Sequence, residues 1–242
     1  MLRKRIFRYT EGHFTERGRE IHRVEALSDA VFAFSVSLLV ASLEVPQTFH
    51  ELLTIVKGAL PFFATVAMIF LFWHQQYNYF RRYGMNDPTT IFLNLVYLAV
   101  ILFYVYPLKF LFSLLLGLLT GINFFPQAAD TGQAVLLNED FPLLIILFST
   151  GYAVIWGLVG IMYNRALNWP HLIQLSQTER LYTKMERRGA WFNMAIGILA
   201  IIIALLGYVA VSGMIYMFIP LILVINKQLY IKEQRNLMRS VQ

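Results

Sequence analysis

Long apolar stretches separated by short polar segments dominate the chain. They cover residues 24–46, 54–80, 89–116, 141–164, 189–211 and 214–231. A hydrocarbon layer ~30 Å thick is crossed by about 20 residues of α-helix, at a rise of ~1.5 Å per residue. Each stretch is therefore long enough to cross a membrane. The pattern predicts an all-α membrane protein with six transmembrane helices per chain.

Composition agrees with this prediction. The 242 residues are 58% hydrophobic and only 14% charged, whereas a soluble domain is about 25% charged. The chain has no cysteine, which excludes disulfides, thiol catalysis and cysteine metal ligands. Residues 1–21 are polar and basic and lack the apolar core of a signal peptide, so we expect a mobile arm that stays on the protein.

The basic residues are distributed unevenly between the two sides of the predicted membrane. When six helices cross the membrane in alternating directions, all but two of the 20 basic residues fall on one side of it. The other side has only Lys57 and Lys109. This bias predicts that both termini are cytoplasmic. The net charge of +6 then reflects topology, and no nucleic-acid partner is expected. The expected organisation is a cytoplasmic arm (1–21), a six-helix transmembrane domain (22–233) and a cytoplasmic tail (234–242).

Several local signals refine the helices. Asp87-Pro88-Thr89 is a good helix start, because proline suits the first turn. Pro107 should kink the third helix.

The connections between helices are expected to be short. A turn at 47–51 is expected to precede the second helix, and Ser212-Gly213 is expected to join the fifth and sixth helices. Small residues in the fourth helix allow close helix packing: Gly151, Gly157 and Gly160.

The first helix carries polar groups that a lipid-facing helix should not carry. Arg23, Glu25, Ser28 and Asp29 crowd its beginning. Ionisable side chains in a membrane segment are costly and normally face protein or a water-filled cavity. The first helix is therefore expected to have a specific task.

The same residues resemble a known family signature. Arg23-Val24-Glu25-Ala26-Leu27-Ser28-Asp29 is similar to the Arg-x-x-x-Phe-Ser-Asp motif of the transmembrane protein 175 family, the lysosomal potassium channel and its bacterial relatives. Leu27 replaces the usual Phe. The resemblance continues more weakly through Trp73, His74, Asn94 and Pro107. The family places a His one turn after the Trp, where this chain has Gln76, so either His74 or Gln76 fills that role.

The resemblance implies a potassium-permeable cation channel, a homotetramer in the bacterial plasma membrane, with the first helix lining a central pore. Phe34, Leu38 and Ala41 lie at i, i+4 and i+7, with Ser37 beside them, so they share a stripe; Leu39 lies off it. Phe34 and Leu38 would form a hydrophobic gate and Ser37 a ring of hydroxyls. Plain helix packing is the alternative for this stripe.

The resemblance also implies an interhelical network that anchors the first helix to the second and third. Its expected members are Arg23, Ser28, Asp29, Trp73, His74 and Asn94. Asp29 has an alternative role, in which it attracts cations at the inner mouth of the pore.

Other functions find little support in the sequence. The five histidines form no pair at ligand spacing, and phosphate-binding, nucleophile and dinucleotide motifs are missing. No enzyme activity, metal site or cofactor is expected, and potassium is the permeant ion rather than a bound group. The alternatives are a secondary transporter or proton-coupled carrier, which should show broken helices and midplane charges, and a non-conducting membrane scaffold.

Overall fold

A computed structural model describes residues 17–18, 20–41, 45–125, 136, 139–169 and 173–241. The regular structure within these ranges is entirely helical. The elements are α2 (Arg23–Ala41), α3 (Phe49–Lys57), α4 (Ala59–Tyr83), α5 (Pro88–Thr120), α7 (Phe141–Asn168), α8 (Gln177–Leu205), α9 (Val209–Met214), the short 3₁₀ helix η1 (Ile215–Phe218) and α10 (Ile219–Val241).

Six helical segments are long and apolar enough to cross a membrane. Four are single helices: α2, α5, α7 and α8. The second span consists of α3 from Glu51 onward and α4, and the sixth runs through α9, η1 and α10. The prediction of an all-α protein with six spans is confirmed.

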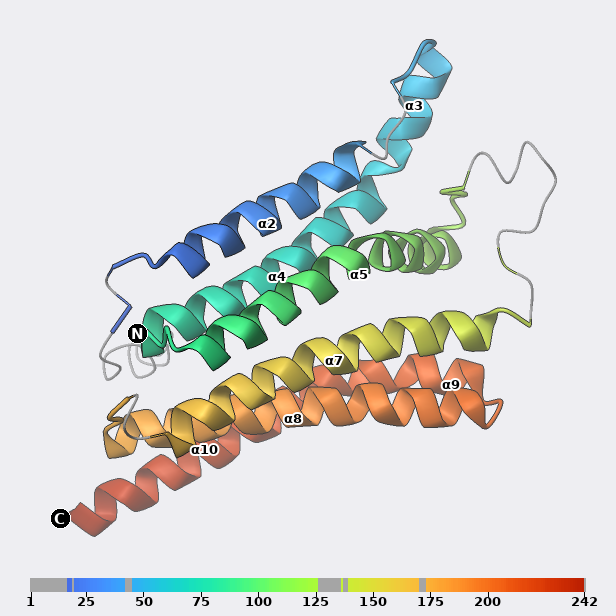
Figure 1. Ribbon diagram of the computed structural model, residues 1–242. Helices are drawn as coiled ribbons and strands as arrows, with labels where there is room; N and C mark the ends of the chain where they lie inside the picture. The colour runs from blue at the N-terminus through green and yellow to red at the C-terminus, as the bar shows by residue number, and fades with distance from the viewer. Residues whose placement is uncertain are drawn as a thin grey trace, which may run out of the picture.

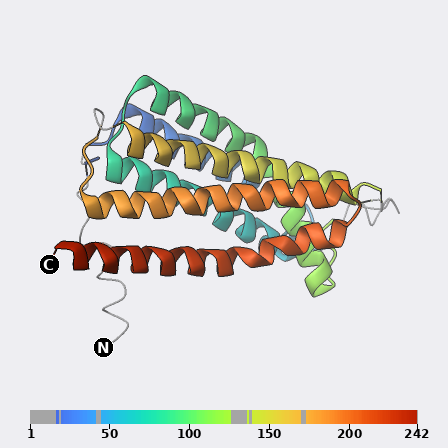
Figure 2. The ribbon, with the colours of Figure 1, turned by 90° about the horizontal axis from the view of Figure 1, so that it is seen from below.

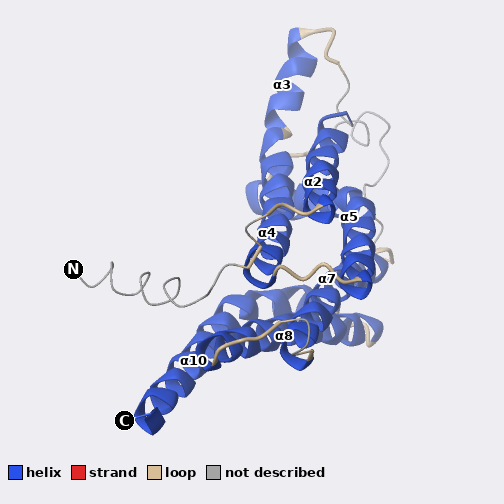
Figure 3. Cartoon of the chain, turned by 60° about the vertical axis from the view of Figure 1, so that its left-hand side comes forward, coloured by secondary structure: helices blue, strands red, loops and turns tan. Residues whose placement is uncertain are grey.

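The spans form two groups that lie against each other (Figure 1). Helices α2, α4 and α5 make one group and α7 to α10 the other, with α5 packed on α7. Figure 3 shows α3 projecting beyond the first group. Fully buried apolar side chains from both groups make one core, and they include Leu39, Ile69, Ile101, Leu108 and Ile155.

The predicted start and bend of α5 are present. Asp87 caps the helix, its carboxylate accepting from Thr90 N at 3.2 Å, and Pro88 occupies the first position. Pro107 lies inside the helix, and α5 changes direction along its length (Figure 1). Proline removes one backbone hydrogen bond and pushes on the preceding turn, so a bend is expected there.

Small residues allow the close packing of α7 that the sequence predicts. A Cβ at Gly151 would collide with the ring of Tyr104 from α5. On the other side, a Cβ at Gly160 would lie 3.1 Å from the Trp191 ring of α8. Helix α7 therefore packs closely on α5 of the other group through Gly151 and on α8 of its own group through Gly160.

Two predicted connections are wrong in detail. Residues 47–51 are not a simple turn, because helix α3 begins at Phe49 and Gly58 separates it from α4. The reversal between the last two spans does not occur at Ser212-Gly213, which lie inside α9. It occurs at Gly207, whose φ of +88° belongs to the left-handed region that glycine adopts without strain.

Two helices extend beyond their apolar stretches. Helix α8 begins among charged residues, where Ser176 and Glu179 form a capping box. Helix α10 continues to Val241, past the predicted tail boundary at 233. As a result, the basic beginnings of α2 and α8 and the basic ends of α4, α7 and α10 gather at one end of the bundle (Figure 1).

Candidate functional site

Helix α2 is covered by its own chain on one side only. The covered side faces α4 and α5 and consists of residues spaced about one helical turn apart: Val24, Ser28, Phe32, Ser35 and Leu39. On the uncovered side Phe34 is 56% exposed, Ser37 and Ala41 are exposed, and Leu38 is half-buried. The predicted stripe therefore has no apolar layer over it within the described part of the chain.

Ser28 is the centre of a buried polar network that joins three helices. Its side chain is fully buried and donates to the Val24 carbonyl at 2.7 Å. Asn94 Nδ2 of α5 donates to Ser28 Oγ at 3.0 Å, and Gln76 Nε2 of α4 donates to Asn94 Oδ1 at 3.3 Å. Because each of these groups is buried, loss of one would leave its partner without a hydrogen bond.

Asp29 lies on the exposed side of α2, unlike its neighbour Ser28. Its Oδ1 accepts a hydrogen bond from Trp73 Nε1 of α4 at 2.7 Å. The Trp73 ring in turn stacks on Tyr77, with ring centroids 5.4 Å apart. Ser28 and Asp29 therefore fasten α2 to different partners, one inside the core and one at its edge.

Two members of the predicted network lie elsewhere. The side chain of His74 does not take part, and the hydrogen bond to Asn94 comes from Gln76. Arg23 lies at the first position of α2 and forms no ion pair among the described residues. Sequence spacing left the choice between His74 and Gln76 open, because only the rotation of α4 against α5 decides which one is buried.

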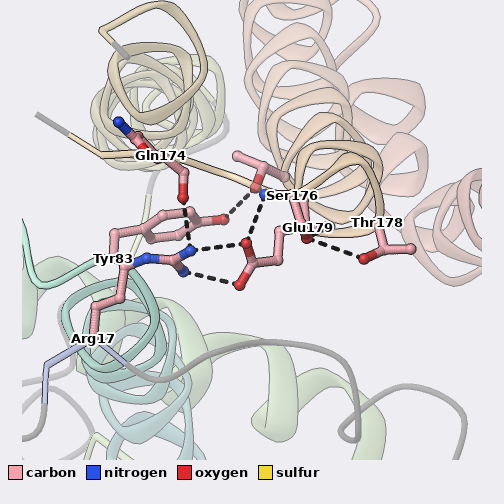
Figure 4. A network of polar contacts seen from close by, with 7 residues as sticks. Arg17, Tyr83, Gln174, Ser176, Thr178 and Glu179 are labelled. Carbon is pink, nitrogen blue, oxygen red and sulfur yellow. Dashed lines mark hydrogen bonds and ion pairs between the residues drawn. The ribbon is translucent and has the colours of Figure 1, made fainter. Parts of the chain in front are cut away.

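A second polar cluster, which the sequence did not reveal, holds the segment that precedes α2 (Figure 4). Arg17 Nη1 and Nη2 each lie 2.9 Å from a carboxylate oxygen of Glu179 in α8. Arg17 also donates to the Gln174 carbonyl at 2.7 Å. Glu179 is only 2% exposed and completes its capping box by accepting from Ser176 N at 2.8 Å.

The backbone of the same segment packs on the end of α4. Gly18 N donates to the Arg81 carbonyl at 3.1 Å, and a Cβ at Gly18 would collide with the Phe80 carbonyl. Of the predicted mobile arm, residues 1–16 and 19 lie outside the described residues. Arg17 and Gly18 are held between α4 and α8, so this part of the prediction is wrong. The Ser-x-x-Glu capping box was a usable sequence signal for one half of the cluster.

The connection between α4 and α5 is tied to α7 by an ion pair. Arg165 Nη2 of α7 lies 2.6 Å from Asp87 Oδ2, and the guanidinium stacks 4.7 Å from the Trp169 ring centroid. Burial pushes the pKa of Asp87 upward, but hydrogen bonds from Thr90 and the charge and hydrogen bond of Arg165 leave it below the usual 3.8.

The described residues offer no group of three or more His, Asp or Glu side chains that could hold a metal ion. The polar groups of α2, α4 and α5 instead bind one another. Six apolar spans with a polar network anchoring the first define a multi-pass membrane protein whose first helix keeps one face uncovered.

The chain belongs to the endosomal/lysosomal potassium channel TMEM175 family, whose model matches residues 23–104. A protein of Marivirga tractuosa named "Potassium channel" is 32% identical over 235 residues, covering 94% of this chain and 95% of that protein. A potassium channel of Chamaesiphon minutus is 29% identical over 160 residues, 63% of this chain and 66% of that protein. The family is one of potassium channels, which are not a class of enzymes.

Solved structures agree with the family assignment. The crystal structure of a variant of the potassium channel MtTMEM175, in complex with a nanobody fusion protein, superposes with a TM-score of 0.79 at 31% identity, covering 91% of this chain and 97% of that one. The lysosomal potassium-selective channel TMEM175 homolog from Chamaesiphon minutus gives a TM-score of 0.55 at 17% identity, covering 86% of this chain and 96% of that one. The second comparison shows the fold alone.

Proposed function

We propose that this chain is the subunit of a potassium-permeable channel. Four copies place α2 around a central axis, and potassium passes along it without energy input. One observation supports this most directly: α2 is anchored through Ser28 on one side, while Phe34, Ser37 and Ala41 on the other side are exposed. A single helix cannot enclose an ion path, whereas closed cyclic assembly of identical chains can.

The stripe supplies the chemistry that a passive pore needs. Rings of Phe34 and Leu38 make narrow apolar levels where water and ions lose hydration, so they act as a hydrophobic gate. The ring of Ser37 hydroxyls between them offers oxygens that partly replace the hydration shell of the ion. The resemblance of the first helix to the family motif and the potassium channel names of the relatives support potassium as the permeant ion.

The orientation follows from the charge distribution. The basic ends of the helices gather at one end of the bundle (Figure 1), and positive charge favours the cytoplasmic side. We place both termini in the cytoplasm and the protein in the bacterial plasma membrane. Because the chain has no cysteine, single-cysteine variants test this. Asn123→Cys should react with an impermeant thiol reagent in intact cells and Gln177→Cys should not; the reverse pattern would contradict the orientation.

Potassium flux into liposomes tests the function. Purified protein should carry potassium down its gradient when a proton ionophore removes the opposing membrane potential, and flux should not depend on a second ion gradient. Dependence on a proton gradient would indicate a carrier, and lack of flux from correctly assembled protein a scaffold. Native mass spectrometry of the same sample should give four subunits; a purely monomeric mass would contradict the shared pore.

A further inference from the structure

A second site lies between α8 and α10, away from the proposed pore helix. A groove of about 740 Å³ opens there, bounded also by Gln75 of α4 and Trp156 of α7. Figure 2 shows α10 running beside α8. The volume falls within the roughly 300–1,000 Å³ typical of ligand sites. Its lining is mainly apolar and includes Met185, Leu223, Tyr230 and Met238.

The charges around the groove do not cancel. Glu186 is the acidic lining residue, and its Oε1 lies 3.6 Å from Arg82 Nη1. The lining cations Lys227 and Arg235 are exposed and form no ion pair within the described part of the chain. The groove therefore presents two unpaired positive charges beside an acid that is already paired.

The position of the groove on α10 indicates the kind of ligand. From Ile219 to Ile225 the helix has no charged residue, and Lys227 is its first. Leu223 contributes to the apolar part of the lining and Arg235 to the charged part, two turns beyond Lys227. The groove therefore spans the level at which a lipid acyl chain meets its headgroup.

We propose that this groove binds an anionic phospholipid of the surrounding leaflet. The phosphate lies at Lys227 and Arg235, and an acyl chain follows Leu223. Two unpaired cations select an anionic headgroup over a zwitterionic one, because the zwitterion brings its own positive charge. The proposal does not depend on conduction.

Native mass spectrometry of delipidated protein titrated with dioleoyl phosphatidylglycerol or dioleoyl phosphatidylcholine tests the site. The wild type should retain phosphatidylglycerol in preference. Lys227→Gln/Arg235→Gln should reduce that preference by about tenfold or more. The matched control is Lys232→Gln/Arg239→Gln, which removes the same charge from positions of α10 that do not line the groove.

A steric variant separates the groove from general surface charge. Leu223→Trp keeps every charge but fills the apolar part, so it should lower retention of both lipids. Equal loss of preference in the two charge variants would overturn the proposal, as would equal retention of both lipids by the wild type. A change in subunit number confined to Lys227→Gln/Arg235→Gln would also overturn it, because the occupant would then be another protein chain.

Discussion

The indole N–H of Trp73 donates to the Asp29 carboxylate at 2.7 Å, at a different side of α2 from the hydrogen bond between Asn94 and Ser28. The two adjacent residues of the motif therefore perform different tasks. Ser28 anchors α2 in the core, and Asp29 is held at the border of the uncovered face. In the proposed channel, a neighbouring subunit or a permeating cation would come close to Asp29 at this border.

Replacing Asn94 should destabilise the protein more than replacing Asp29. Asn94→Leu keeps the approximate volume but leaves Ser28 and Gln76 without their shared partner, and a lost buried hydrogen bond costs about 1–3 kcal/mol. Asp29→Asn keeps an oxygen that accepts from Trp73. Thermal unfolding in detergent should show a clearly lower Tm for Asn94→Leu and a small change for Asp29→Asn.

The Asp29→Asn variant also separates the two roles of the acid. If Asp29 attracts cations at the pore mouth, conductance should fall while subunit number stays unchanged. If it stabilises assembly, the yield of tetramer should fall instead. A Tm of Asp29→Asn as low as that of Asn94→Leu would contradict the division of tasks between Ser28 and Asp29.

Breaking the pair between Arg17 and Glu179 should loosen the segment before α2. Arg17→Gln removes a charge-assisted pair from a carboxylate that is 2% exposed, at a cost of about 1.5–3 kcal/mol. Hydrogen exchange should increase at Gly18 and at the first turn of α8. The control is Lys184→Gln, which changes an exposed residue of α8, the helix that carries Glu179. Equal hydrogen exchange in the two variants would contradict a role of the ion pair in fixing the segment before α2.

Acid should weaken the tie between Asp87 and Arg165. The folded state lowers the pKa of Asp87 from its ordinary value of 3.8. The ionised carboxylate therefore stabilises the fold fully above that ordinary pKa, and this stabilisation is lost as the pH falls through the lower pKa of the folded state. At pH 7, Asp87→Asn should lower Tm by about 2–4 °C for each kcal/mol by which it reduces the free energy of unfolding. The Tm difference from wild type should shrink below about pH 4; a constant difference would contradict an ionised Asp87.

Much of the fold could be predicted because it depends on local sequence. The lengths of the apolar stretches predicted the six spans, and Asp87-Pro88 predicted the start of α5. The reversal at Gly207 was missed because Ser212-Gly213 offered a similar local signal, and only packing decides between them. The pair between Arg17 and Glu179 joins residues 162 positions apart, and no local pattern encodes such a contact.

The candidate site shows the same limit. Helical periodicity placed Leu39 off the stripe, but it did not show that Leu39 is fully buried. A polar residue there would disrupt the core, so Leu39 is a poor control for the stripe. Val40 is a better control for Phe34 and Leu38, since it is 52% exposed and lies about 120° around the helix from Phe34 and about 160° from Leu38.

Single-channel recording of assembled stripe variants is the most direct test of a pore lined by α2. Phe34→Ala and Leu38→Asn should each raise the cation leak, because they widen or wet an apolar ring, whereas Val40→Asn should change it little. Ser37→Val should weaken the preference for potassium over sodium more than it changes conductance. If conductance and selectivity stay unchanged in all three stripe variants, α2 does not line the pore.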